Sequence, residues 1–299
     1  MVRRIPKHLV RKGMFIESVE CPDTEFSGRR FLVQSDETLR AILATSATYA
    51  LVNPQKSTVD IDGSAPSTLQ AEERQRTIET VAQATQTLRG SFDAVRMGQL
   101  QVEALNPVAD EISDRIEASP DIFLKVTRLK SKDKGTYVHS LAVSALMMRL
   151  ARALGYAEDA MRELGVAGLL HDVGKLMVPN AILNKNGGLE AAERRVVRNH
   201  PEIGYRLLKE QGNVSEMILD ICRYHHEALD GSGYPAGLKA DRIGPEIRLA
   251  TVCDVFEALT STRPYKRPWT ARDALNWMFD REQLFDKKMV IRLGGIFAD

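Results

Sequence analysis

From about Asp121 to its end, the chain has helical periodicity throughout and no convincing strand. Apolar residues recur there at the three- and four-residue spacing of an amphipathic helix, and Gly or Pro separates the segments. The segments that we predict to be helices are 139–155, 159–176, 190–199, 202–211, 214–226, 245–259 and 271–280. Consecutive helices without strands pack as a bundle, so we predict an all-helical C-terminal domain.

The N-terminal third is different, because short apolar runs alternate there with Gly, Pro and Asp. Met14–Val19 and Arg30–Ser35 are typical of strands, and Glu37–Asn53 is typical of a helix followed by a strand. A long polar stretch without Pro, from Gln70 to Leu105, predicts a helical connector, which is either a passive spacer or a dimerisation surface. The predicted fold class is therefore mainly α. We expect a small α+β regulatory domain with its connector over residues 1–105 and the helical domain over residues 106–299.

The composition excludes several classes of protein. The 41 Lys and Arg balance 40 Asp and Glu to a formal charge of +1, which argues against a general binder of nucleic-acid polymers. No apolar run reaches the roughly 18–20 residues that span a membrane, and no apolar segment follows the basic start MVRRIPKHLVRK, as a secretory signal requires. Cys21, Cys222 and Cys253 are far apart and form no CxxC motif, so we expect buried free thiols in a cytoplasmic protein.

Five of the six histidines lie in the helical region, beside features that suit metal binding. In LLHDVGK, His171 and Asp172 end a strongly apolar segment, where a buried carboxylate needs a partner such as a divalent cation. Lys175 follows His171 by four residues, so we expect its ammonium group on the same side, where it could contact a phosphate. His225 and His226 are adjacent at a helix end, and neutral imidazoles there are good ligands for a transition metal.

Taken singly, each of these residues has an ordinary explanation in packing, capping or ion pairing. Together they belong to a set of seven nitrogen and oxygen donors without a cysteine, namely His139, His171, Asp172, His200, His225, His226 and Asp254. Such a set suits two Fe, Mn or similar divalent ions better than a structural zinc, and we expect Asp172 to bridge them. Paired ions roughly 3.5–4 Å apart activate a bridging hydroxide and stabilise charge on phosphate, so the set predicts phosphoester hydrolysis.

The motifs LLHDVGKLMVP, NHPEIG, YHHEALDGSGYPAGL and CDVFEALTSTRPYKR, in this order, resemble the HD-GYP subgroup of the HD phosphohydrolase superfamily. The Gly-Tyr-Pro signature is Gly233–Tyr234–Pro235, and the resemblance covers about Ser119 to Asp286. Residues 1 to about 105 resemble, less strongly, an uncharacterised domain that often precedes HD-GYP in bacterial proteins.

The resemblance implies a cyclic di-GMP phosphodiesterase that forms linear pGpG and, in many members, GMP. It implies that the seven donors are the metal ligands and that Asp172 and Lys175 have catalytic roles. Carried over by position, the substrate-binding groups are Lys175, Asp230, Tyr234, Arg263 and Lys266. Lys175, Arg263 and Lys266 would hold phosphate. Tyr234 would lie beside the pocket, and Asp230 would fix the loop or contact substrate. Signalling proteins of the GGDEF or PilZ type are the implied partners, and a homodimer stays open.

Two features depart from the family pattern. Some members carry a Glu four residues before the first histidine that helps to hold a third metal ion, whereas this chain has Gly135, so we expect a two-metal site. Relatives with this N-terminal domain usually continue beyond the ending MVIRLGGIFAD, so we expect the chain to be shorter than they are and its last helix to pack imperfectly.

Two alternative functions stay open. One is hydrolysis of another cyclic dinucleotide such as cyclic GMP-AMP, because the GYP loop does not separate guanine from adenine. The other is a catalytically silent receptor for cyclic di-GMP, against which the complete ligand set argues. The sequence does not determine the identity of the metal, the final product or the signal that the N-terminal domain senses.

Overall fold

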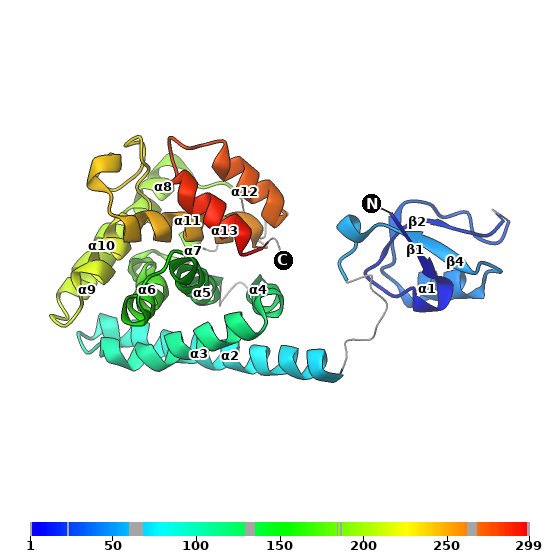
Figure 1. The fold of residues 1–299 in the computed structure, drawn as a ribbon, viewed down its shortest axis with the longest axis horizontal. Helices are drawn as coiled ribbons and strands as arrows, with labels where there is room; N and C mark the ends of the chain where they lie inside the picture. The colour runs from blue at the N-terminus through cyan, green and yellow to red at the C-terminus, as the bar shows by residue number, and fades with distance from the viewer. Residues whose placement is uncertain are drawn as a thin grey trace. The chain divides into compact units, whose positions relative to one another are not determined.

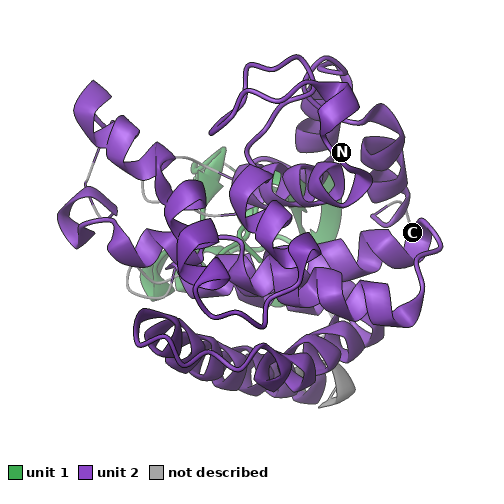
Figure 2. Ribbon diagram, turned by 90° about the vertical axis from the view of Figure 1, so that its left-hand side faces the viewer, with its two compact units in different colours: residues 1–71 green, residues 72–299 purple. Residues whose placement is uncertain are grey.

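The computed structural model describes residues 2–22, 24–59, 68–128, 135–183, 185, 187–261 and 268–297. The chain separates into two compact units, residues 1–71 and residues 72–299, which Figure 2 shows in different colours. Each unit has an apolar core of its own. The mainly α fold class is confirmed, with a small antiparallel sheet in unit 1 and a bundle of helices in unit 2.

Unit 1 is built on a four-stranded antiparallel sheet with the order β1-β4-β2-β3. Its elements are β1 (Arg3–Pro6), β2 (Phe15–Val19), β3 (Phe31–Leu32), α1 (Asp36–Ala44) and β4 (Tyr49–Val52). Side chains such as Ile16, Ile42 and Val52 are fully buried in its core. The elements expected at 14–19, 30–35 and 37–53 are present. Strand β1 is not predicted by the sequence pattern, because Ile5 is its only buried residue beside two exposed arginines.

Helix α2 (Thr68–Arg96) belongs for most of its length to unit 2. Its apolar stripe, which includes Val81, Leu88 and Phe92, is buried in the core of the helical bundle. The sequence pattern predicts a domain boundary between residues 105 and 106, whereas the compact units divide after residue 71. The difference has a simple cause, since the connector packs on the bundle instead of standing apart from it.

The bundle is organised around α5 (Gly135–Ala153), which is buried over most of its length. It packs against α3 (Asn106–Ala118), α4 (Pro120–Arg128), α6 (Glu158–Leu170), α11 (Pro245–Thr260) and α13 (Lys287–Gly295) (Figure 1). The remaining helices are α7 (Asn180–Leu183), α8 (Ala191–Arg198), α9 (His200–Lys209), α10 (Glu216–Tyr224) and α12 (Ala271–Phe279). None of the described helices combines the length and the hydropathy that crossing a bilayer requires.

The end of α6 differs from the sequence-based expectation. A single helix is predicted over residues 159–176, but α6 ends at Leu170 and Val173–Met177 forms a separate 3-10 turn. The turn brings Gly174 against the start of α9, where a Cβ atom would lie only 1.9 Å from the carbonyl oxygen of His200. The prediction of one continuous helix is therefore wrong, because this close backbone contact requires the chain to leave the axis of α6.

The last helix, α13, has a packed inner face. Met289, Val290 and Leu293 are buried against the bundle, whereas Ile291 on the outer face is 56% exposed. The inner face of this helix is thus packed, and the expected imperfect packing is not seen there.

Candidate metal centre

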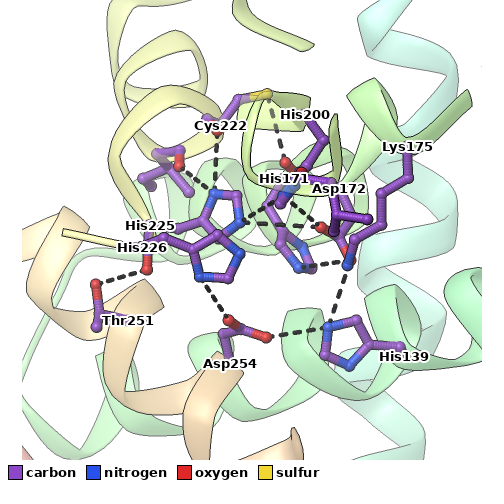
Figure 3. Close-up of polar contacts among 12 residues, drawn as sticks. His139, His171, Asp172, Lys175, His200, Cys222, His225, His226, Thr251 and Asp254 are labelled. Carbon is purple, nitrogen blue, oxygen red and sulfur yellow. Dashed lines mark hydrogen bonds and ion pairs between the residues drawn. The ribbon is translucent and has the colours of Figure 1, made fainter. Parts of the chain in front are cut away.

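All seven side chains expected as metal ligands lie around one centre in the helical bundle (Figure 3). They come from α5 (His139), the turn after α6 (His171, Asp172), the start of α9 (His200), the end of α10 (His225, His226) and α11 (Asp254). Six of them are buried, and the side chain of His226 is 22% exposed. Segments far apart in the sequence are brought together here by the packing of the helices around α5.

The carboxylate of Asp172 lies between the imidazoles. Its Oδ1 atom is 3.1 Å from Nε2 of His200 and 3.9 Å from Nε2 of His225. Its Oδ2 atom is 3.5 Å from Nε2 of His139 and 3.5 Å from Nε2 of His171. One carboxylate therefore presents an oxygen to each of two pairs of histidines, which is the position that a bridging ligand takes.

Asp254 spans the centre in a similar way. Its Oδ1 atom is 3.0 Å from Nε2 of His139, and its Oδ2 atom is 3.5 Å from Nδ1 of His226 (Figure 3). From the sequence, only Asp172 is expected to lie between the two groups of donors. The position of Asp254 across the centre depends on how closely α5 and α11 pack. No pattern along the sequence predicts that distance.

Backbone carbonyl groups orient three of the imidazoles. Nδ1 of His171, His200 and His225 each donates to the carbonyl oxygen three residues earlier, at 2.7, 2.7 and 3.0 Å. Because a carbonyl only accepts, Nδ1 carries the proton and Nε2 keeps a free lone pair. Nε2 of His171 is buried and has no hydrogen-bond partner among the described residues. An orphaned nitrogen of this kind fits coordination of a metal ion.

Burial keeps most of these imidazoles neutral, which is the form that binds a metal. It lowers the pKa of His171 and His225, and it lowers the pKa of His226 to about 3. His139 behaves differently. Burial opposes its protonation, but the nearby carboxylates of Glu257 and Asp254 outweigh burial and raise its pKa.

Both aspartates are charged despite their burial. Burial disfavours the ionised form of Asp172, but the ammonium group of Lys175 holds the pKa of this carboxyl well below its usual range. The hydrogen bond and charge of His139 have the same effect on the pKa of Asp254. The centre therefore offers two carboxylates at neutral pH.

The donor atoms form two groups, each with its atoms within 4.8 Å of one another. One group is Asp172, His200, His225 and His226, and the other is His139, His171 and Asp254. Imidazole and carboxylate donors without thiolates suit divalent transition metals. The residues present thus fit divalent metal ions.

Lys175 lies beside the centre, as the sequence analysis expects. Its Nζ atom is 2.5 Å from Oδ2 of Asp172, and its side chain is 22% exposed. The ammonium group is thus bound to the carboxylate that spans the centre while its side chain keeps some access to solvent.

Two of the expected substrate-binding residues, Tyr234 and Asp230, lie in the loop after α10. The Tyr234 ring lies against the His226 ring, with 4.7 Å between centroids. Asp230 is exposed, and its Oδ1 atom accepts from the backbone N–H of Ser232 at 2.8 Å. This contact favours a loop-fixing role for Asp230 over contact with substrate. The other two, Arg263 and Lys266, lie outside the described residues.

Two buried glutamates that the sequence analysis does not single out hold parts of the site. Oε2 of Glu257 lies 2.5 Å from Nδ1 of His139. The carboxylate of Glu227 accepts from the backbone N–H groups of residues 236, 237 and 238 at 2.7, 3.1 and 3.0 Å, and so holds the GYP loop. Each has a signal in the sequence, because Glu257 follows Asp254 by three residues on one helix face and Glu227 directly follows His226.

Known proteins are similar to both parts of the chain. The HD domain family matches residues 112–289, and a domain of unknown function, DUF3391, matches residues 2–105. The cyclic di-GMP phosphodiesterase PA4108 of Pseudomonas aeruginosa is 37% identical over an alignment of 310 residues. The alignment covers 97% of this chain and 75% of that protein. The 3'3'-cGAMP-specific phosphodiesterase 2 of Vibrio cholerae is 36% identical over 166 residues, which cover 54% of this chain and 31% of that protein.

A solved structure supports the fold as well. Bd1817, an HDG"Y"P protein from Bdellovibrio bacteriovorus, matches with a TM-score of 0.60 and 15% sequence identity over 100% of both chains. The family matches, the relatives and the Gly233–Tyr234–Pro235 signature lead to the same assignment. The chain belongs to the HD domain family, in its HD-GYP group, and carries a DUF3391 domain over residues 2–105.

Proposed function

We propose that the buried centre binds two divalent metal ions, iron or manganese, and hydrolyses cyclic di-GMP to linear pGpG, with GMP as a further product. The observation that carries this proposal is the placement of two carboxylates. Asp172 and Asp254 each turn one oxygen toward either group of imidazoles. Carboxylates between two sets of nitrogen donors suit a pair of ions that share ligands.

Each group of donors would hold one ion. Asp172, His200, His225 and His226 would hold the first, and His139, His171 and Asp254 would hold the second. Gly135, one helical turn before His139, has no side chain that could contribute to a third ion, which supports a count of two. When bound, the ions would lower the pKa of water and offset negative charge on phosphate, which is the chemistry that hydrolysis of a diester needs.

The chain's own groups would position the substrate. Lys175 is close enough to the centre for its ammonium group to turn from Asp172 to a phosphate oxygen and offset the charge that develops there. Tyr234 covers one face of His226 and would keep bulk water from that side of the centre. The phosphate-binding roles of Arg263 and Lys266 stay predictions from the sequence.

The similarity to PA4108 extends over both domains and supports cyclic di-GMP as the substrate. Cyclic GMP-AMP is the second candidate, because a phosphodiesterase named for it is similar over about half of this chain. A receptor without catalysis is disfavoured by the complete set of donors and by the neutral state of three of its histidines.

The test is turnover by the full chain, loaded anaerobically with iron or manganese, against cyclic di-GMP, cyclic GMP-AMP and cyclic di-AMP. We expect two ions per chain, with pGpG from cyclic di-GMP as the main product by chromatography. Asp172→Ala should abolish turnover, whereas Asp114→Ala, on the exposed side of α3, should not change it. Full turnover by Asp172→Ala with normal metal content would refute the two-ion scheme.

Three further expectations remain proposals of the same kind. We propose a cytoplasmic location, contact with signalling proteins of the GGDEF or PilZ type, and a homodimer. Light scattering on the purified full chain tests the last of these directly.

A further inference from the structure

Two side chains, His226 and Arg198, contact the ring of Tyr234 beside the centre. The Tyr234 ring lies against His226, with 4.7 Å between centroids. The guanidinium carbon of Arg198 lies over the same tyrosine ring, 4.4 Å from its centroid. His226 is a donor of the centre, Tyr234 is partly buried and Arg198 is exposed. Arg198 is therefore an exposed cation that contacts the same tyrosine ring as a donor of the centre.

Arg198 makes no ion pair with an acidic residue in the part of the chain that the structure describes. Other arginines nearby are paired, since Arg206 and Arg223 both bind Glu202, at 3.3 and 2.9 Å. A guanidinium group has five N–H donors and a permanent charge. Stacking on Tyr234 fixes its plane without using these donors, so they remain available to an anion.

The chemistry of the proposed substrate calls for such a cation. A cyclic dinucleotide has two phosphodiester groups, and a single metal centre cleaves one at a time. The other phosphate keeps its negative charge and must lie elsewhere on the protein. Lys175 is bound to Asp172 of the centre, whereas Arg198 is exposed and lies over Tyr234. A planar guanidinium group binds a phosphate through two parallel hydrogen bonds.

Resting on the proposed function, we propose that Arg198 binds the phosphate of the cyclic dinucleotide that is not being cleaved, with Tyr234 holding the guanidinium plane in position. Arg198 is then a substrate-binding residue that takes no part in bond breaking. Its loss should weaken substrate binding far more than it slows the chemical step.

The test compares Arg198→Gln, Arg198→Lys and a matched control, Arg195→Gln, in the full metal-loaded chain. Gln keeps a flat group that can pack on Tyr234 but removes the charge. We expect Arg198→Gln to raise KM for cyclic di-GMP about ten-fold or more, as for a lost hydrogen bond to a charged group, with a much smaller change in kcat. The KM of Arg198→Lys should lie between those of Arg198→Gln and the parent protein. Arg195, exposed on the same helix, should be replaceable without effect.

Two further measurements separate this role from others. The KM of the parent should rise with ionic strength more steeply than that of Arg198→Gln, because the variant has lost a charge contact. The rise in KM should be equal for cyclic di-GMP and cyclic GMP-AMP, because both carry the same phosphates. A selective loss for the guanine-only substrate would overturn the proposal in favour of base recognition, and a parent-like KM in Arg198→Gln would overturn it outright.

The proposed function can fail separately. If the parent binds cyclic di-GMP in equilibrium dialysis without turning it over, the proposed hydrolysis is wrong, and weaker binding by Arg198→Gln would still support the role of Arg198. If the parent turns over cyclic di-GMP and Arg198→Gln has the same KM, only the inference about Arg198 fails.

Discussion

Glu257 and His139 are 118 positions apart, yet Oε2 of the glutamate lies 2.5 Å from Nδ1 of the imidazole, and both side chains are buried. The contact fixes the ring so that its Nε2 atom faces Asp172 and Asp254. A carboxylate behind a metal-binding histidine orients the ring and makes its other nitrogen a stronger donor. The pair exists because α5 and α11 pack against each other.

Replacing this carboxylate should weaken metal binding. Glu257→Gln keeps the shape of the side chain but removes its charge, so we expect the affinity for Mn²⁺ to fall about 10–100-fold. Titration calorimetry of Mn²⁺ into chelator-treated protein measures the change. Glu246→Gln makes the same substitution on the same helix, next to Tyr156, and serves as the control. Parent-like affinity in Glu257→Gln would show that the hydrogen bond to His139 is not needed to orient the ring.

The GYP loop should depend on Glu227. Its carboxylate accepts from three consecutive backbone N–H groups, whereas the amide of Glu227→Gln has one acceptor oxygen and would turn its own N–H groups toward other donors. We expect faster amide hydrogen exchange at residues 236–238, with a loss of about 1–3 kcal/mol of local stability. Exchange followed by mass spectrometry gives the result, with Glu210→Gln, an exposed position directly after α9, as control. Unchanged exchange at these amides would rule out this anchoring role.

Gly174 should tolerate no side chain. A Cβ atom there would lie 1.9 Å from the carbonyl oxygen of His200 and 2.6 Å from the nitrogen of Gly204, and both are backbone atoms. We expect Gly174→Ala to cost about 1–3 kcal/mol of stability and to lower metal affinity, because Asp172 and His200 flank this contact. Gly90→Ala, in α2 with open space around it, should instead stabilise the protein by about 0.5–1 kcal/mol.

Urea unfolding followed by tryptophan fluorescence measures both changes. The two tryptophans of the chain, Trp269 and Trp277, lie in unit 2, so the signal reports on the helical bundle. Equal stabilities of the two alanine variants would contradict the packing of the turn after α6 on α9.

The metal-free protein should lose stability as the pH falls from about 6.5 to 4.5. In this window the unfolded chain, with histidine pKa values of about 6.5, binds protons that the folded chain excludes from His171, His225 and His226. Stability should fall by up to about 1.4 kcal/mol per pH unit for each of these histidines.

The shifted pKa values of His139, Asp172 and Asp254 should not change this slope. Because its pKa is raised in the folded state, His139 contributes its full stabilisation below about pH 6.5. That contribution is lost only as the pH rises further. The lowered pKa values of Asp172 and Asp254 contribute fully above about 3.9 and are lost only at more acidic pH. Urea midpoints of chelator-treated protein from pH 7.5 to 4.5 provide the measurement. His226→Asn should reduce the slope, and midpoints independent of pH would contradict the lowered pKa values.

Much of the site follows from residue types and spacing. The seven donors are identified by their chemistry and by the absence of cysteine among them, and the GYP signature is contiguous. The helices that carry His139, His200 and Asp254 follow from apolar periodicity, because a helix is stabilised by contacts between residues three and four apart. Residue type, contiguous motifs and local periodicity can all be read along the chain, so these features follow from the sequence without a tertiary structure.

Tertiary packing decided the rest. The turn after Leu170 exists because Gly174 meets the backbone of α9, and α2 belongs to the bundle because its stripe is buried there. The position of Asp254 between His139 and His226, the hydrogen bond between Glu257 and His139, and the place of Arg198 over Tyr234 all depend on distances between different elements. Such distances are set by the shapes of buried side chains across the whole core, and periodicity along one segment carries no information about them.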